Sequence, residues 1–140
     1  MKALLAVDGS THALRAAQTL GELAKHCAGA RAHVLNVQPH VPYLDLLGDE
    51  RKSSVDRLMQ ERGMDAMESA CKALTLAGVP FEVEIVSGDA ALAIVRVAVA
   101  KQCDFILMGT RGMGAIAGMA LGSVATKVAH LADLPVTLVK

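Results

Sequence analysis

The stretch Gly109-Thr110-Arg111-Gly112, followed after nine residues by Gly122-Ser123, stands between a predicted strand and a predicted helix. The residues before it, 104–108, read Asp-Phe-Ile-Leu-Met and have the apolar character of a buried strand. After Ser123, apolar residues recur with helical spacing, so the loop opens onto a helix N-terminus. Free N–H groups and the positive end of the helix dipole at such a terminus favour an anion. The stretch therefore predicts a phosphate-binding loop in an α/β fold.

The composition of this loop makes the prediction more specific. Glycines at positions 109, 112, 114, 118 and 122 would permit positive φ angles and a close approach of the main chain to a ligand. Ser123 is expected to cap the helix and to offer its hydroxyl to a ligand oxygen. Arg111 is the nearest cation, because residues 113–121 contain no basic residue. The loop has neither the Gly-Lys-Ser/Thr ending of a P-loop nor the pattern G-x-G-x-x-G.

Strand and helix patterns alternate along the chain. Strands are predicted at residues 2–7, 31–38, 81–86, 104–108 and 136–139, and helices at 10–27, 50–76, 87–100 and from 123 onward. This alternation predicts one α/β domain, residues 1–140, with a five-stranded parallel sheet and helices on both faces. Asp8 follows the first strand and Gly109 follows the fourth, and both suit a ligand crevice where the winding reverses. We therefore expect these two strands to be neighbours and the order to be 3-2-1-4-5.

Three further expectations concern single elements. Glu82 and Glu84 alternate with apolar residues, which indicates an edge strand with one solvent-facing side. The helix that ends at Ala100 has Arg96 as its one charged residue after the start at Asp89, and it is expected to be largely enclosed. The loop at residues 40–49 is interpreted as either a flap or a second contact surface.

The composition argues against several function classes. Apolar residues make up 53% of the 140 residues and charged residues 20%, which argues against disorder. Lys plus Arg and Asp plus Glu balance at 14 each, which argues against binding to nucleic acid or a membrane. The three cysteines are interpreted as core thiols, and the five histidines form no zinc pattern, so no metal site is predicted. Because the N-terminus has no signal-peptide pattern, the expected location is the cytoplasm.

Over its whole length the chain resembles the universal stress proteins. The first strand with its acidic turn at 4–10, the second strand at 33–37 and the helix start at 87–89 are similar to parts of that family. The most specific similarity is to the family's ATP-binding pattern: glycine, two residues, glycine, nine residues, glycine, then Ser or Thr. This pattern is matched by Gly109, Gly112, Gly122 and Ser123. The resemblance implies a Rossmann-like fold of the adenine nucleotide alpha hydrolase type.

The resemblance also implies a site for ATP, or another adenine nucleotide, together with Mg²⁺ held mainly by phosphate oxygens and water. In the family's ATP-binding branch, the main chain at Val37 would recognise adenine and the Asp8 carboxylate would lie beside the nucleoside and the metal. Gly109 and Gly112 would approach the ribose and phosphates, and the start of the last helix would bind the phosphates. The expected binding residues are Asp8, Val37, Met108, Gly109, Arg111, Gly112, Gly122, Ser123 and Val124.

Several of these residues have a plainer interpretation. Asp8 also fits a turn or helix-cap residue, and Val37 also fits a core residue. Arg111 is interpreted either as a phosphate contact or as a solvated loop residue, and Lys127 as a solvated surface residue.

The sequence favours a nucleotide-binding regulatory protein over an enzyme. The loop offers no obvious general base, and no Ser-His-Asp or Cys-His set is visible. One alternative is a slow ATPase or an autophosphorylating protein, with Ser123 or Thr110 as the acceptor. Another is a dimeric interaction protein that binds no nucleotide and keeps the glycine motif as a turn.

The last strand predicts a homodimer. Residues 136–139 are apolar, carry no charge and are expected at a sheet edge, which is a liability unless it is covered. The resemblance implies that this strand pairs with its copy across a twofold axis.

Overall fold

The computed structural model describes residues 1–113 and 121–140, in which strands and helices alternate. The strands are β1 Lys2–Ala6, β2 Arg31–Gln38, β3 Phe81–Ser87, β4 Phe105–Gly109 and β5 Val136–Val139. The helices are α1 Thr11–Ala24, α2 Asp49–Leu76, α3 Ala90–Ala100 and α4 Ser123–Leu131, with a short 3-10 helix, η1, at Leu44–Leu46. The predicted strands and helices are therefore present, with ends that shift by at most three residues.

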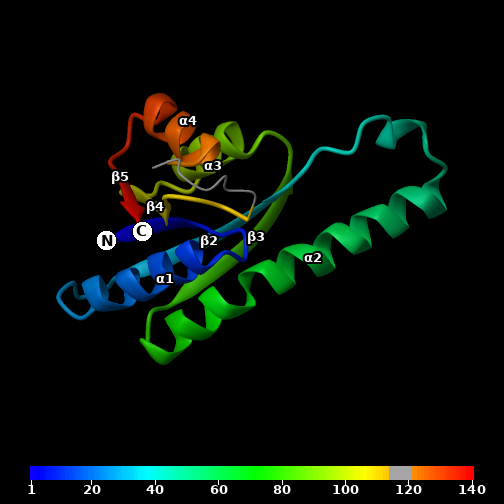
Figure 1. Ribbon diagram of the computed structural model, residues 1–140. Helices are drawn as coiled ribbons and strands as arrows, with labels where there is room; N and C mark the ends of the chain where they lie inside the picture. Colours follow the sequence, from blue (N-terminus) through cyan, green and yellow to red (C-terminus); the bar gives the residue numbers. More distant parts are fainter. Residues whose placement is uncertain (114–120) are drawn as a thin grey trace.

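The five strands form one parallel sheet in the order β3-β2-β1-β4-β5, which confirms the predicted order. The central strand β1 pairs with β2, from Lys2 with Arg31 to Ala6 with Leu35, and on its other side with β4. Figure 1 shows α1 and α2 against one face of the sheet and α3 and α4 against the other. The fold is thus a doubly wound α/β domain whose winding reverses between β1 and β4.

Each face of the sheet has its own hydrophobic cluster. On the face covered by α1 and α2, Leu5 packs with Leu20 and Leu74. On the face covered by α3 and α4, Leu4 packs with Ile94 and other apolar side chains. Successive residues of a strand point to opposite faces, so β1 contributes to both clusters. This explains why the first strand is a continuous apolar run rather than an alternating one.

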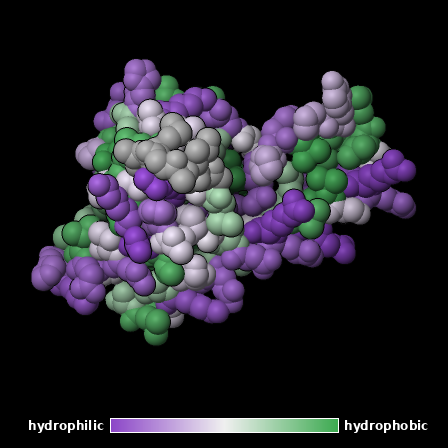
Figure 2. All heavy atoms as spheres, viewed as in Figure 1, coloured by the Kyte–Doolittle hydropathy of each residue, from purple (hydrophilic) through white to green (hydrophobic). Residues whose placement is uncertain are grey.

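Helix α2 is longer than the part of the sheet that it covers. Its buried residues, from Gly63 to Leu74, all lie in its second half. Its first half projects beyond the sheet and forms a separate arm in the space-filling view (Figures 1 and 2). A Cβ at Gly63 would lie 2.6 Å from Cδ1 of Ile85 in β3. Glycine at this position therefore lets α2 cross closely over the sheet, which explains the interruption of the helical apolar pattern.

Helix α3 is less enclosed than its sequence predicts. Leu92 is 55% exposed and Val99 is 61% exposed, on the side of the helix that faces away from the sheet. The expectation was wrong because only one layer of helices covers this face, so even an apolar helix keeps one side in solvent. In the part of the chain that the structure describes, no helix is long and apolar enough to cross a membrane.

The cysteines fit the interpretation as core thiols only in part. Cys103 is buried, and burial raises the pKa of its thiol. Cys71 is half-buried and packs from α2 against the core. Cys27 is also only half-buried, in the turn after α1, so it is not a core residue.

Strand β3 is an edge strand, as predicted, but one of its two glutamates is not simply solvent-facing. His33 in β2 is 2% exposed, and its Nε2 lies 2.7 Å from Oε2 of Glu84. The Nζ of Lys101 lies 3.0 Å from the same oxygen. Burial by itself would raise the pKa of Glu84, but the hydrogen bonds with Lys101 and His33 bring that pKa below its usual value. Glu84 is thus an ion-pair partner inside the fold. Glu82 is exposed as expected, and its Oε2 lies 3.5 Å from Nδ1 of the same histidine.

We expect Glu84→Gln to lower the free energy of unfolding by about 1 kcal/mol at neutral pH, because the charged acceptor for Lys101 and His33 is lost. A carboxylate with a lowered pKa contributes stability above its unfolded pKa of about 4.3, and that contribution is lost as the pH falls through its folded pKa. The difference in the free energy of unfolding between the two proteins, measured by urea titration, should therefore be largest at neutral pH and disappear in acid. Glu61→Gln, at an exposed position of α2, is the matched control. An equal loss in neutral and in acid solution would contradict this account.

Candidate functional site

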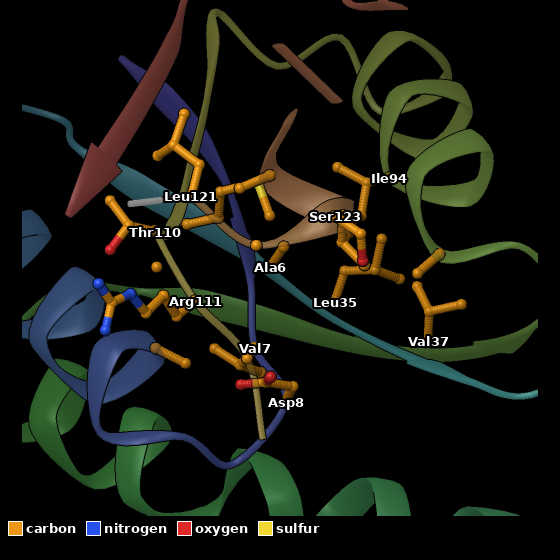
Figure 3. Close-up of a pocket in the computed structure, with 18 residues that line it drawn as sticks. Ala6, Val7, Asp8, Leu35, Val37, Ile94, Thr110, Arg111, Leu121 and Ser123 are labelled. Atoms are coloured by element: carbon orange, nitrogen blue, oxygen red, sulfur yellow. The ribbon is translucent and has the colours of Figure 1, made fainter. Parts of the chain in front are cut away.

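A cavity of about 320 Å³ opens at the carboxyl ends of β1 and β4, where the strand order reverses (Figure 3). Its walls come from the ends of β1, β2 and β4, from the first turns of α3 and α4, and from the loop after β4. Open α/β sheets place their ligand crevices at this position. The volume lies within the range of small-molecule sites. The cavity is therefore the candidate functional site.

Every residue of the predicted binding set lines this cavity. The set consists of Asp8, Val37, Met108, Gly109, Arg111, Gly112, Gly122, Ser123 and Val124. Two further glycines that were expected to help shape the loop, Gly114 and Gly118, lie outside the described residues. Residues far apart in the sequence are thus brought to one place by the ends of three strands and the start of α4.

Apolar side chains form one wall of the cavity. The wall contains Ala6, Leu35, Val37, Ile94, Met108 and Ala125. Figure 3 shows Leu35, Val37 and Ile94 grouped on the same side as Ser123. Leu35 and Ile94 were not predicted as site residues. In the sequence pattern, an apolar residue that faces a cavity cannot be distinguished from one that faces the core. An apolar wall beside polar loops is suited to a flat ring with polar substituents.

Asp8 holds together the two loops at the polar end of the cavity. Its Oδ1 accepts the N–H of Ser10 at 3.0 Å, and its Oδ2 accepts the N–H of Met113 at 3.0 Å. The Ser10 hydroxyl accepts the N–H of Ala13 at 3.2 Å and donates to the carbonyl of Arg111 at 3.4 Å. The turn role that was the plainer interpretation of Asp8 is therefore present, and the carboxylate also lines the cavity.

Gly109 and Gly112 are needed for close packing rather than for unusual main-chain angles. A Cβ at Gly109 would lie 2.6 Å from the Cβ of His12, at the start of α1, and one at Gly112 would overlap the Asp8 carboxylate. Gly109, Gly112 and Gly122 are not among the glycines with positive φ, so that expectation is wrong for these positions. Glycine leaves room at 109 for α1 and at 112 for Asp8.

Helix α4 begins at Ser123, as expected, but its N-cap differs from the prediction. Gly122 is the N-cap, with φ −73°, and Ser123 is the first helical residue, so the prediction that Ser123 caps the helix is wrong. The Gly122 N–H donates to the carbonyl of Thr110 at 2.7 Å, and the first helical bond runs from Thr126 N–H to the Gly122 carbonyl at 3.0 Å. The N–H groups of residues 123–125 therefore have no partner within the helix. All three residues line the cavity, where these donors would suit an anion.

Charge at the cavity is nearly balanced. Of the described residues that line it, Asp8 is the one acid and Arg111 the one base. Lys127 is exposed, as interpreted, and its Nζ lies 2.7 Å from Oδ2 of Asp89, which is also exposed. That hydrogen bond and the one from the Leu92 N–H lower the pKa of Asp89. This ion pair joins the start of α3 to α4. Arg111 is therefore the positive charge of the cavity among the described residues that line it.

The fold and the cavity define a Rossmann-like α/β protein with a candidate small-molecule site at the point where the strand order reverses. The profile described as Universal stress protein family matches residues 1–140. The Universal stress protein in QAH/OAS sulfhydrylase 3'region of Thermus aquaticus is 38% identical over 138 residues, which cover 98% of this chain and 96% of the relative. The chain belongs to the universal stress protein family, and the predicted resemblance is confirmed.

Solved structures agree with this fold. The structure of MJ0577, a test case for assigning biochemical function from structure, superposes with a TM-score of 0.85, at 26% identity over 99% of this chain and 94% of that one. A universal stress protein in complex with cAMP superposes with a TM-score of 0.74, at 24% identity over 100% and 97% of the two chains. Two others, from Archaeoglobus fulgidus with dAMP and from Arabidopsis thaliana with AMP, superpose with TM-scores of 0.69. The three structures with bound cAMP, dAMP and AMP are less than 25% identical to this chain, so their similarity establishes the fold alone.

We expect Gly109→Ala to lower the free energy of unfolding by about 2 kcal/mol, because the new Cβ would collide with the Cβ and main chain of His12. Gly122→Ala is the matched control, since its Cβ would approach no atom closer than 3.4 Å. That change should cost less than about 1 kcal/mol, the loss typical of alanine at an N-cap. Urea unfolding of the three proteins measures both values. Equal losses for the two variants would show that the contact between β4 and α1 does not require glycine.

Proposed function

We propose that this protein is a regulatory protein that binds adenine nucleotides, ATP among them, and acts as a homodimer in the cytoplasmic stress response. The observation that carries the proposal is the pairing of two environments in one cavity: an apolar wall and the free N–H groups at the start of α4. A nucleotide requires both, one for its base and one for its phosphate. The complexes of structural neighbours with cAMP, dAMP and AMP support the same class of ligand.

The main chain of Val37 supports adenine as the base. Strand β1 ends at Ala6 while β2 continues to Gln38, so Val37 lies beyond the last pair of β1 and β2. Among the described residues, neither the N–H nor the C=O of Val37 has a hydrogen-bond partner. Adenine presents an acceptor, N1, beside an amino donor, which matches a free N–H and a free C=O. Guanine has a donor where adenine has the acceptor N1, and an acceptor where adenine has the amino donor. The same N–H and C=O groups of Val37 would therefore disfavour guanine.

The opposite end of the cavity would hold the phosphates. The N–H groups of Ser123 and Val124 and the Ser123 hydroxyl would donate to phosphate oxygens, and Arg111 would neutralise part of their charge. Asp8 is the one carboxylate among the described residues that line the cavity. Mg²⁺ carried in with a triphosphate would therefore be held mainly by phosphate oxygens and water, with Asp8 beside it.

A binding role accounts better for these residues than catalysis does. No histidine is present among the described residues that line the cavity, and each Asp8 oxygen already accepts a main-chain N–H. These two hydrogen bonds explain the position of Asp8 as a link between two loops, without a role as a general base. A nucleotide that joins the apolar wall to α4 would instead favour one arrangement of the surrounding loop, which a partner protein can recognise.

Calorimetric titration of nucleotide-stripped protein tests the proposal. We expect saturable binding of AMP and of Mg·ATP, and at least roughly tenfold weaker binding of the guanine nucleotides, because one mismatched hydrogen bond costs about 1.4 kcal/mol. Ser123→Ala should weaken binding by roughly threefold to tenfold through loss of a hydroxyl donor. Ser53→Ala, on the projecting part of α2, is the control. Absence of binding at millimolar ATP would contradict the proposal and favour an interaction protein that binds no nucleotide. Release of ADP during the titration would favour a slow ATPase.

The dimer proposal follows from the free edge of β5. Carbonyls of the odd-numbered residues face β4: the Ile106 N–H donates to Pro135 O at 2.9 Å, and the Thr110 N–H donates to Val139 O at 2.8 Å. The main-chain groups of Val136 and Leu138 therefore face away from the sheet, because donors and acceptors of a parallel strand alternate in direction. Such an edge can pair with a second copy.

We expect Val136→Pro to convert the dimer to a monomer, because it removes one outward-facing N–H and leaves the hydrogen bonds to β4 in place. Proline is tolerated at the first residue of an edge strand. Sedimentation velocity measures the change. Thr137→Ala, which alters an exposed side chain but not the edge N–H groups, should remain dimeric. If Val136→Pro sediments as the parent protein does, the dimer does not form through β5.

A further inference from the structure

We propose that Asn36 is a positioning residue that keeps the main chain of Val37 free to recognise the base. It would do so by occupying the carbonyl of Val7, the group with which the Val37 N–H would otherwise pair. The inference rests on the proposed function, since it concerns how the same cavity distinguishes its ligand. It goes further by assigning base selectivity to a side chain that does not line the cavity.

The hydrogen-bond ladder of β2 shows why Val37 would be expected to have a partner. Even-numbered residues bond to β3, as in Ala32 N–H to Pro80 O at 2.9 Å. Odd-numbered residues bond towards β1, as in Val7 N–H to Leu35 O at 2.9 Å. In a regular parallel ladder the next bond would join the Val37 N–H to the Val7 carbonyl. Among the described residues that bond is missing, although Val7 is already in register with β2.

The Val7 carbonyl is instead bonded to a side chain. The Nδ2 of Asn36 donates to Val7 O at 2.9 Å. The amide must have this orientation, because its nitrogen can donate to a carbonyl and its oxygen cannot. The Oδ1 of Asn36 accepts from Nε2 of Gln38 at 2.6 Å, which holds the amide in that orientation. Asn36 is 3% exposed, so both bonds lie away from bulk solvent. The amide therefore replaces one rung of the ladder.

The two faces of the sheet separate this amide from the ligand. Val34 packs in the cluster under α1 and α2, and Leu35 packs in the cluster under α3 and α4. Because strand residues alternate, Asn36 lies on the first face and Val37 on the second, where the cavity is. Asn36 is not among the residues that line the cavity. Its effect would pass through the Val7 carbonyl to the Val37 peptide group, within the plane of the sheet.

Asn36→Leu distinguishes this role from simple satisfaction of a buried carbonyl. Leucine has a similar size and no donor, so the Val7 carbonyl would accept the Val37 N–H and the ladder would gain its missing rung. In the ligand-free parent protein we expect fast hydrogen exchange at the Val37 amide. In Asn36→Leu we expect that exchange to slow at least roughly tenfold, as for other amides in the ladder. Equal exchange in the two proteins would overturn the proposal, and this measurement needs no nucleotide.

A ligand analogue tests the consequence for recognition. In 1-deaza-AMP a C–H replaces N1, so the analogue cannot accept the Val37 N–H. The parent protein should bind AMP roughly tenfold more tightly than 1-deaza-AMP, the value of one good hydrogen bond. Asn36→Leu should lose that preference, because its affinity for AMP falls while its affinity for the analogue changes little. If Asn36 had a purely structural role, the Asn36→Leu change would weaken the binding of AMP and of 1-deaza-AMP equally. That outcome would overturn the proposal.

Val34→Ala is the control for general damage to β2. Val34 is fully buried on the same face as Asn36, and its truncation creates a cavity without touching the Val7 carbonyl. It should lower the melting temperature yet preserve the preference for AMP over 1-deaza-AMP. If the parent protein binds no nucleotide, the proposed function fails. The exchange rates of Val37 in the parent and in Asn36→Leu still decide whether Asn36 frees this peptide group.

Discussion

The constraint on which this structure depends is the unequal length of three neighbouring parallel strands. β1, buried on both faces, stops at Ala6, whereas β2 continues to Gln38 and β4 to Gly109. Parallel strands whose helices leave to opposite faces diverge at their carboxyl ends, so the missing end of β1 becomes a hollow. The cavity is a consequence of this early ending. The free main chain of Val37 depends in addition on Asn36, whose amide donates to the Val7 carbonyl at 2.9 Å.

Polar contacts at the edge of this hollow come from groups that also stabilise the fold. Asp8 bonds to Ser10 and Met113, and thereby joins the turn after β1 to the loop after β4. The Gly122 N–H bonds to Thr110, which fixes the start of α4 against the end of β4. The donors left over at the start of α4 are those that a helix cannot satisfy internally. Binding groups are therefore held in place by hydrogen bonds that exist without a ligand.

Errors in the sequence-based predictions concern contacts between elements rather than the elements themselves. Ser123 has the residue type of a cap, but the N-cap is Gly122, whose N–H bonds to the Thr110 carbonyl, and Ser123 is the first helical residue. Lys127 is a surface residue as expected, but its ion pair with Asp89 was not predicted, because it depends on how closely α3 and α4 pack. Glu84 reads as solvent-facing until β3 is placed beside the buried His33. In each case the partner lies on another element, and its distance is not encoded in local periodicity.

By itself, the sequence determined the order of strands and helices, the sheet topology and the end of the sheet at which the glycine loop lies. It could do so because apolar periodicity, turn residues and glycine spacing are local properties of the chain. Only the tertiary structure decided which apolar residues face the cavity, which glycines make room for a neighbour and which peptide group is left without a partner. Those properties depend on the register and length of adjacent strands, which only their packing against one another determines.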